Sequence, residues 1–140
     1  MLFRILWSLI NPFWKFSPRH FWFWRRWLIR IFGGKIANNV KIYPSAKIIQ
    51  PWNIKIKKNT VISWNVTIYA VGKINIGENV IISQGSHLCS ASHDFKNKSF
   101  DLIKSFIEVD DNTWIAAEAF IGNGVRLGKN SIIGARSVVF

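Results

Sequence analysis

The sequence predicts an all-β domain, a parallel β-helix of six-residue repeats that follows a short amphipathic helical segment. Three observations predict it. After residue 34 an aliphatic residue returns at every sixth position, a small or β-branched residue usually follows it by four positions, and Gly and Asn gather in between. A period of six matches neither the ~3.6 of an α-helix nor the ~2 of a strand. It fits a solenoid in which each hexapeptide supplies one short strand and one turn, and three hexapeptides complete a coil.

The composition changes near Gly33 and divides the 140-residue chain into a helical segment, residues 1–34, and a repeat domain, residues 35–140. The first part holds most of the eight tryptophans, and isoleucine and valine dominate the second. The whole chain carries 19 Lys and Arg against 7 Asp and Glu, which gives a formal net charge of +12. Such a chain prefers anionic partners, namely nucleic acid, an anionic membrane surface or the phosphates of a small ligand. The single cysteine, Cys89, excludes an internal disulfide and a multi-thiolate metal site, and we expect it to pack inside as a small apolar residue.

Two helices are expected in the first part. The first is indicated by apolar residues at the spacing of one helical face, Leu2, Ile5, Leu6 and Leu9. We expect it to end at Asn11-Pro12, because proline lacks the amide hydrogen that a helix interior needs. The second is expected over roughly residues 20–32, with Ser17-Pro18 as its start signal and Gly33 as its end.

The role of residues 1–32 stays open between two interpretations. No run reaches the ~18 apolar residues that span a bilayer. No secretory signal peptide is expected, because Asn11-Pro12 cuts the apolar region and no small-residue cleavage site follows. The two helices either lie in the membrane interface, where Trp and Arg are favoured, or pack on the repeat domain as a cap. The same apolar faces serve both purposes.

The aliphatic positions of the repeat domain form four phased series. They are Ile36, Ile42, Ile48 and Ile54; Ile56, Ile62 and Ile68; Ile76, Ile82 and Leu88; and Val109, Ile115, Ile121, Leu127, Ile133 and Val139. We expect each side chain to point to the axis and stack on its counterpart 18 residues away, as in the pairs Ile36–Ile54, Val109–Leu127 and Ile115–Ile133. After Leu88 the pattern breaks off, and an inserted loop is expected over residues 94–108.

The repeats and two longer segments resemble a known family. The segments NVIISQGSHLCSASHDF and WIAAEAFIGNGVRLGKNSIIGARSVV, with the hexapeptide pattern, resemble the left-handed parallel β-helix acyltransferases, in particular the acetyltransferases of colanic acid and related exopolysaccharide biosynthesis. The resemblance covers nearly the whole chain, and left-handedness is implied by it alone. It implies an O-acetyltransferase that moves an acetyl group from acetyl-CoA, as co-substrate, to a sugar hydroxyl of an exopolysaccharide or lipopolysaccharide precursor.

The family places a histidine where a coil gives way to a loop, and His93 occupies that position. A neutral imidazole suits removal of a hydroxyl proton near pH 7, so His93 is the candidate general base of a direct transfer without covalent intermediate. Its second ring nitrogen is expected to bond a backbone carbonyl or a carboxylate, with Asp94 as a candidate. We expect His20 to be solvated or to face headgroups and His87 to be an exposed turn residue. An acyl-cysteine route through Cys89 remains a competing hypothesis.

The resemblance implies further site residues. Acceptor binding is assigned to Ser63, where relatives have asparagine, to Asn65 and to Asp94. Coenzyme A is expected along the groove between subunits of a homotrimer, at Trp114, Ala116, Ala117, Ala135 and Arg136. Arg126, Lys129 and Arg136 are candidates for pairing with the nucleotide phosphates.

Other functions stay open as alternatives, namely a non-catalytic hexapeptide scaffold or truncated homologue and a basic protein that binds membrane surfaces. No metal site is expected, since His87 and His93 lack a third partner, and no nucleic-acid partner, since no recognition motif is present. The expected location is cytoplasmic and peripheral, at the inner face of the cytoplasmic membrane. The sequence ends at SVVF within a coil, where relatives usually continue, so we expect either a truncation or an end that trimer packing covers.

Overall fold

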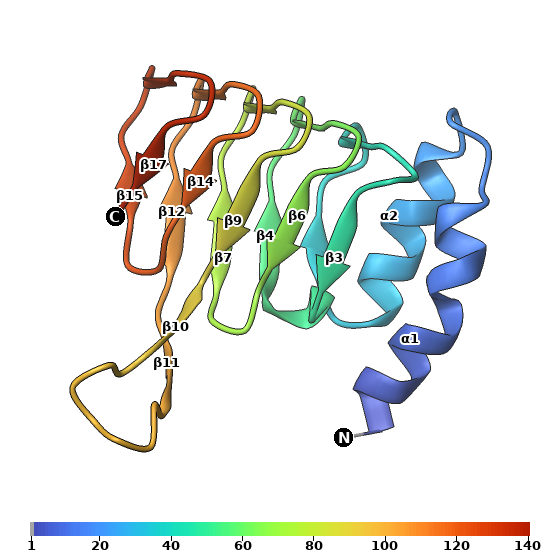
Figure 1. Cartoon of the computed structure of the whole chain (residues 1–140). Coiled ribbons are helices and arrows are strands. Elements are labelled where there is room, and N and C mark those ends of the chain that lie inside the picture. The colour runs from blue at the N-terminus through green and yellow to red at the C-terminus, as the bar shows by residue number, and fades with distance from the viewer. Residues whose placement is uncertain (1) are drawn as a thin grey trace.

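The structure is a computed structural model that describes residues 2–140, and it forms a three-sided parallel β-helix with two helices at one end (Figure 1). Seventeen strands of two or three residues follow the helices in this part of the chain. Fifteen of them form three five-stranded parallel sheets, and the other two form an antiparallel hairpin that projects from the solenoid. The expected architecture, parallel coils behind a helical segment, is therefore confirmed.

Each sheet takes one strand from every coil. Sheet A contains β1 (Lys35–Ile36), β4 (Ile54–Ile56), β7 (Ile74–Ile76), β12 (Ile107–Val109) and β15 (Arg126–Leu127). Sheet B contains β2 (Lys41–Ile42), β5 (Val61–Ile62), β8 (Ile81–Ile82), β13 (Trp114–Ile115) and β16 (Ile132–Ile133). Sheet C contains β3 (Lys47–Ile49), β6 (Thr67–Tyr69), β9 (His87–Cys89), β14 (Phe120–Ile121) and β17 (Val138–Val139).

The core is a column of aliphatic side chains stacked from coil to coil. In sheet B the fully buried members lie in direct register: Ile42, Ile62, Ile82 and Ile115. At the corners, buried hydroxyl groups satisfy backbone carbonyls. Thr60 Oγ1 donates to the Gly77 carbonyl and Ser86 Oγ to the Ala116 carbonyl, each at 2.8 Å. The small or β-branched position of the repeat thus closes the corner without leaving a buried carbonyl unpaired.

The register differs from the expected 18 residues in the first coils. Ile36 lies opposite Ile56 rather than Ile54, so the expected pair Ile36–Ile54 is wrong. Val109–Leu127, and likewise Ile115–Ile133, pair as expected. The extra residues of the longer coils sit at one corner, between sheets C and A, where the 3-10 turn η1 (Pro51–Asn53) occupies the first coil. The same corner of the third coil carries the hairpin, so the insertion enlarges a corner that is already long in the coils before it.

The corner between sheets A and B is built from a ladder of asparagines. Asn59, Asn79, Asn112 and Asn130 have φ values of 58°, 55°, 59° and 60°. Asparagine tolerates this left-handed conformation better than most residues do. Neighbouring amides are joined by hydrogen bonds, of 3.1 Å from Asn79 to Asn112 and 3.2 Å from Asn112 to Asn130. The same left-handed turn residue therefore repeats in the second to fifth coils with asparagine in place of glycine.

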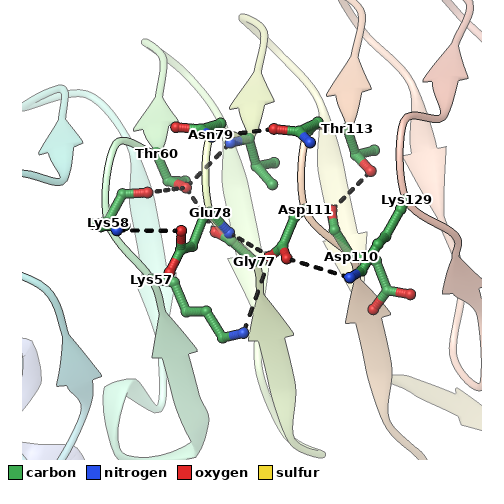
Figure 2. A network of polar contacts seen from close by, with 12 residues as sticks. Lys57, Lys58, Thr60, Gly77, Glu78, Asn79, Asp110, Asp111, Thr113 and Lys129 are labelled. Atoms are coloured by element: carbon green, nitrogen blue, oxygen red, sulfur yellow. Dashed lines mark hydrogen bonds and ion pairs between the residues drawn. The ribbon is translucent and has the colours of Figure 1, made fainter.

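A carboxylate joins four coils at the same corner, as Figure 2 shows. Asp111 Oδ1 accepts the amide hydrogen of Glu78 at 2.8 Å, and its carboxylate lies 4.0 Å from the ammonium groups of Lys57 and Lys129. The backbone hydrogen bond, followed by the two lysines, holds the pKa of Asp111 below its ordinary value of 3.8.

The two helices cap the first coil through side-chain donors. In the solenoid, each coil donates amide hydrogens to carbonyls of the next, as Ala37 N does to Ile56 O at 3.0 Å. No coil precedes the first within residues 2–140, so the equivalent carbonyls there need other donors. Two indoles of α1 (Leu2–Lys15) supply these donors for sheet C and for the corner between sheets B and C. Trp7 Nε1 donates to Ile48 O at 2.7 Å, and Trp14 Nε1 donates to Ala46 O at 3.0 Å.

Three arginines of α2 (Trp22–Ile31) continue this pattern along sheets A and B. Arg25, Arg26 and Arg30 donate to the carbonyls of Ile42, Val40 and Ile36, respectively. The side chain of Arg25 is fully buried, and it also donates to Ser17 Oγ and to the carbonyls of Pro18 and Arg19 in the turn between the helices. Burial and the neighbouring Arg26 lower the pKa of Arg25 to about 10, which leaves it charged at neutral pH. Packing as a cap, one of the two interpretations of the helical segment, is therefore observed for residues 2–32.

The expectation that the first helix ends at Pro12 is wrong. α1 runs through Pro12 to Lys15, and Phe16 N still donates to the Pro12 carbonyl at 2.9 Å. Trp7 and Trp14 hold the helix to the solenoid on both sides of the proline, while Pro12 itself is exposed, so the carbonyl freed by its missing amide hydrogen can bond water. α2 agrees with its expected extent to within two residues, and Gly33 ends it with a φ of 87°.

Candidate active site

His93 ends β10 (Ala91–His93), the first strand of a hairpin that leaves the corner between sheets C and A. The second strand, β11 (Leu102–Lys104), pairs antiparallel with it and places His93 opposite Leu102. The inserted loop expected over residues 94–108 is therefore shorter, because only residues 94–101 form the turn and Ile107 already lies in the core. Two paired strands hold His93 more firmly than a long loop does.

A buried serine and a glycine fix the base of the hairpin. Ser90 is fully buried. Its hydroxyl accepts the amide hydrogen of Gly72 at 2.8 Å and donates to the Tyr69 carbonyl at 2.9 Å. The returning chain passes Gly72 so closely that a Cβ there would lie 1.8 Å from the carbonyl oxygen of Ser105. Only glycine allows the hairpin to leave and re-enter the coil at this point.

The imidazole of His93 is held in one tautomer. Its Nδ1 lies 2.6 Å from the carbonyl oxygen of Phe100. A carbonyl can only accept a hydrogen bond, so Nδ1 carries a proton, and in the neutral imidazole the free lone pair is on Nε2. The side chain is exposed, which leaves Nε2 open to a second molecule. This is the arrangement that a general base needs, and it meets the expectation of a backbone carbonyl at the second nitrogen.

Phe100 adopts a backbone conformation that bulky residues rarely take. Its φ is 48°, in the left-handed region, and its amide donates to the Asn97 carbonyl at 3.0 Å. This conformation directs the Phe100 carbonyl back at His93, so local strain accompanies the contact that orients the imidazole. The residue was missed at the sequence level, because a backbone carbonyl has no side-chain signature.

Asp94 shapes the turn and does not orient the imidazole. Its Oδ1 accepts the amide hydrogen of Lys96 at 3.0 Å, and its own amide donates to the Asp101 carbonyl at 2.9 Å. An aspartate that accepts the amide two residues on forms an Asx-turn. The Phe100 carbonyl, rather than the candidate Asp94, therefore orients the imidazole.

The other expected site residues lie on different parts of the solenoid from His93. Ser63, Asn65, Ala116, Ala117, Ala135 and Arg136 occupy the corner between sheets B and C in three coils. Trp114 lies on the outer face of sheet B between Ile81 and Ile132. Because His93 leaves from the corner between sheets C and A, the width of sheet C separates the two groups. One chain therefore does not bring His93 together with the expected coenzyme residues.

Several of these residues already have partners in the single chain. Trp114 Nε1 donates to Ser83 Oγ at 3.0 Å, and Arg136 Nε lies 2.7 Å from Glu118 Oε2. Lys129 is paired with Asp111, whereas Arg126 is exposed on sheet A. The amide of Asn65 donates to Ser45, and its side chain borders a hollow of about 590 Å³ beneath α1.

Two expectations near the hairpin are wrong. His87 is a strand residue of sheet C and not an exposed turn residue; it is half-buried against Phe120, with ring centroids 5.4 Å apart. Its Nε2 is buried with no hydrogen-bond partner among the described residues, and burial lowers its pKa below 6.5. Cys89 lies on the outer face rather than inside, and its Sγ donates to the Ala91 carbonyl at 3.2 Å. A carbonyl cannot take the thiol proton, so this contact does not favour an acyl-cysteine route.

Metal-binding clusters and membrane-spanning helices are both absent from residues 2–140. No group of three or more His, Cys, Asp or Glu side chains in this range is placed to hold a metal ion. Neither helix of the same range is long and apolar enough to cross a membrane.

Comparison with known proteins gives a consistent picture, although no protein-family model matches the chain. The chain is 36% identical over 137 residues to WcaF of Escherichia coli K12, assigned as a colanic acid biosynthesis acetyltransferase; the match covers 98% of this chain and 75% of WcaF. It is 30% identical over 118 residues to the galactoside O-acetyltransferase of the same strain, covering 82% of this chain and 58% of that protein.

Solved structures share the fold. The hexapeptide-repeat acetyltransferase of Vibrio cholerae complexed with acetyl coenzyme A superposes with a TM-score of 0.87 at 24% identity, over 99% of this chain and 76% of that one. A galactoside acetyltransferase in complex with coenzyme A gives a TM-score of 0.85 at 25% identity, over 95% and 68%. The expected fold class, a left-handed parallel β-helix of hexapeptide repeats with an N-terminal helical segment, is confirmed.

Proposed function

The chain belongs to the hexapeptide-repeat acetyltransferase family, and we propose that it is an O-acetyltransferase with His93 as general base. The donor is acetyl-CoA, and the acceptor is a sugar hydroxyl of an exopolysaccharide or lipopolysaccharide precursor. The similarity to WcaF and to the galactoside O-acetyltransferase supports the class of acceptor. The observation that carries the proposal is the contact between His93 Nδ1 and the Phe100 carbonyl, which in the neutral imidazole puts the free lone pair on the exposed Nε2.

The transfer needs no covalent enzyme intermediate. His93 Nε2 takes the proton of the acceptor hydroxyl as the hydroxyl oxygen attacks the thioester carbonyl. The carbon–sulfur bond then breaks, and the imidazolium returns the proton to the departing thiolate. Throughout, the Phe100 carbonyl accepts a hydrogen bond from Nδ1–H and stabilises the transient positive charge of the imidazolium. Backbone amide hydrogens near the thioester stabilise the negative oxygen that forms.

A homotrimer completes the site in this proposal. His93 and the coenzyme candidates Ala116, Ala117, Ala135 and Arg136 lie on different corners of one chain, and a three-fold assembly brings the hairpin of one subunit to the corner of its neighbour. An apolar row on the outer face of sheet B, Ile81, Trp114 and Ile132, is exposed in the single chain and offers a surface for such packing.

The catalytic role of His93 is tested by thiol release from acetyl-CoA with a panel of sugar acceptors. We expect His93→Ala to lower turnover by about 10²-fold or more, the usual contribution of a positioned general base. His20→Ala is the matched control, because His20 is exposed and lies between the two helices of the cap. Retention of full turnover by His93→Ala rules it out as the base, and loss of turnover by both variants indicates a role in folding.

Sharing of the site is tested by complementation between two inactive variants. Ala135→Trp fills the expected coenzyme corner at an exposed position, and His93→Ala removes the base. If a site combines residues of two subunits, co-expression restores about one quarter of the wild-type sites, because a random mixture pairs an intact hairpin with an intact corner at that frequency. Activity that stays absent in a mixed trimer contradicts the shared site.

A further inference from the structure

The first helix has an apolar face that the cap does not use. At ~100° per residue, Trp7 and Trp14 share the face on the solenoid. A polar stripe runs along one flank and contains Arg4, Ser8, Asn11 and Lys15. The sector opposite the solenoid is apolar and exposed, and contains Leu2, Ile5, Leu6, Leu9, Phe13 and, beyond the end of the helix, Phe16. α1 therefore has two apolar faces, and only one of them is covered within the described chain.

The second helix repeats this arrangement. Arg25, Leu28 and Ile29 are buried on its solenoid face, while Phe23, Trp27 and Ile31 are exposed at a spacing of four residues. Both helices lie across the same end of the β-helix (Figure 1). Because each turns its buried face toward the coils, their exposed apolar rows point away from the coils. We call these exposed apolar residues of α1 and α2, with Phe16, the cap face.

The charge around the cap face has one sign. Every Asp and Glu of the chain lies at or after Glu78, whereas thirteen of the 19 Lys and Arg precede it. Arg4 and Lys15 flank the apolar sector and are exposed. Arg25 and Arg26 instead donate hydrogen bonds to carbonyls of the first coil. The cap face of a second copy of this chain is a poor partner, because both cap faces are surrounded by positive charge and repel each other.

We propose that the cap face docks on an anionic membrane surface, with both helices lying in the plane of the interface. An apolar helix face flanked by Lys and Arg inserts ~5–10 Å at the boundary between headgroups and acyl chains, and the cations pair with lipid phosphates. Tryptophan at the edge of such a face suits the interface. The leaflet concerned is the one that faces acetyl-CoA, the inner face of the cytoplasmic membrane.

Docking also positions the catalytic hairpin relative to the lipid. The hairpin leaves the third coil, two strand spacings of ~4.8 Å from the first, and the helix layer adds ~10 Å. His93 then stands on the order of 20 Å from the headgroups, so the acceptor sugar is one that extends from a lipid carrier. This last step rests on the proposed function, whereas the docking itself does not.

Flotation of the full chain with vesicles tests the docking without any measurement of activity. We expect the protein to float with vesicles of equal parts phosphatidylcholine and phosphatidylglycerol, and to remain in the bottom fraction with phosphatidylcholine alone. Phe13→Glu, at a side chain that is 69% exposed, is expected to reduce the bound fraction by about tenfold, since it places a charge in the inserted face. Phe95→Glu is the matched control on the catalytic hairpin, where the side chain is 78% exposed, and it is expected to bind as the wild type does.

A second pair of variants separates charge from apolar insertion. Lys15→Glu is expected to weaken binding several-fold, and Lys98→Glu, the same change on the hairpin, to leave it unchanged. Leu9→Glu repeats the test of Phe13, and melting temperatures equal to wild type show that the variants are folded. Equal binding by Phe13→Glu, Leu9→Glu and wild type overturns the proposal. So does light scattering in which Phe13→Glu breaks a larger assembly apart while flotation is unaffected, because the face then binds a second copy.

Discussion

The Nδ1 atom of His93 lies 2.6 Å from the carbonyl oxygen of Phe100, and these two residues meet across the turn of the hairpin. The donor is a side chain and the acceptor is backbone in the left-handed region, with a φ of 48°. The orientation of the imidazole therefore depends on a conformation that most residues resist.

The identity of residue 100 should control turnover. Phe100→Val is expected to lower turnover by about tenfold, because a β-branched residue disfavours positive φ at a cost of about 1–3 kcal/mol and the carbonyl moves away from Nδ1. Phe100→Gly adopts the same φ freely and keeps the carbonyl, so it should retain turnover within a few-fold. Steady-state thiol release at several pH values measures both. Equal loss in the two variants indicates that the phenyl ring acts, and contradicts the role of the carbonyl.

The approach of the hairpin to Gly72 should be sensitive to a single methyl group. Gly72→Ala places a Cβ 1.8 Å from the Ser105 carbonyl oxygen and is expected to destabilise the fold by about 1–3 kcal/mol while displacing His93. Gly128→Ala is the control, because its Cβ meets nothing closer than Ser131 Oγ at 4.0 Å. Urea unfolding and turnover of both variants test this, and equal behaviour of the two contradicts the close approach.

Buried Arg25 should be necessary for the helical cap. Arg25→Met is expected to lower the free energy of unfolding by about 3 kcal/mol, because hydrogen bonds from a charged group contribute about 1.5–3 kcal/mol and the carbonyls of Ile42, Pro18 and Arg19 lose their donor. Arg4→Met, at an exposed position, serves as the control. Urea denaturation followed by tryptophan fluorescence reports the cap directly, since it holds most of the tryptophans. A change of similar size in both variants contradicts a specific role for Arg25.

The stability contributed by Asp111 should depend on pH. Its pKa is depressed in the folded state, so the protonated unfolded chain is favoured as pH falls below the ordinary value of 3.8. Wild type should therefore exceed Asp111→Asn in stability at pH 7, and the difference should shrink as the pH falls from 3.8 toward the lower folded pKa. Melting temperatures across this range, with Asp110→Asn as a neighbouring control, measure it. A difference that is independent of pH shows that the carboxylate charge is not involved.

Much of the fold follows from local sequence. Each hexapeptide carries its own aliphatic residue and its own turn, and each coil contacts only its neighbours, so periodicity is sufficient to place the strands, the inward positions and the interruption after Leu88. The place of His93 on the segment that interrupts the repeat follows in the same way. The register of the first coils does not follow from the repeat. The extra turn at Pro51–Asn53 makes Ile36 pair with Ile56 instead of Ile54, without changing which residues face inward.

Long-range packing determines the rest. The spacing of the tryptophans and arginines in residues 2–32 fits a membrane surface and a cap equally well. Only the folded structure shows that Trp7, Trp14 and Arg25 donate hydrogen bonds to the carbonyls that the first coil leaves unpaired. The Phe100 carbonyl that orients His93 was likewise not predictable from pattern. The physical reason is common to these cases: every residue has a backbone carbonyl, so the sequence cannot mark which one will need a partner until the chain is folded around it.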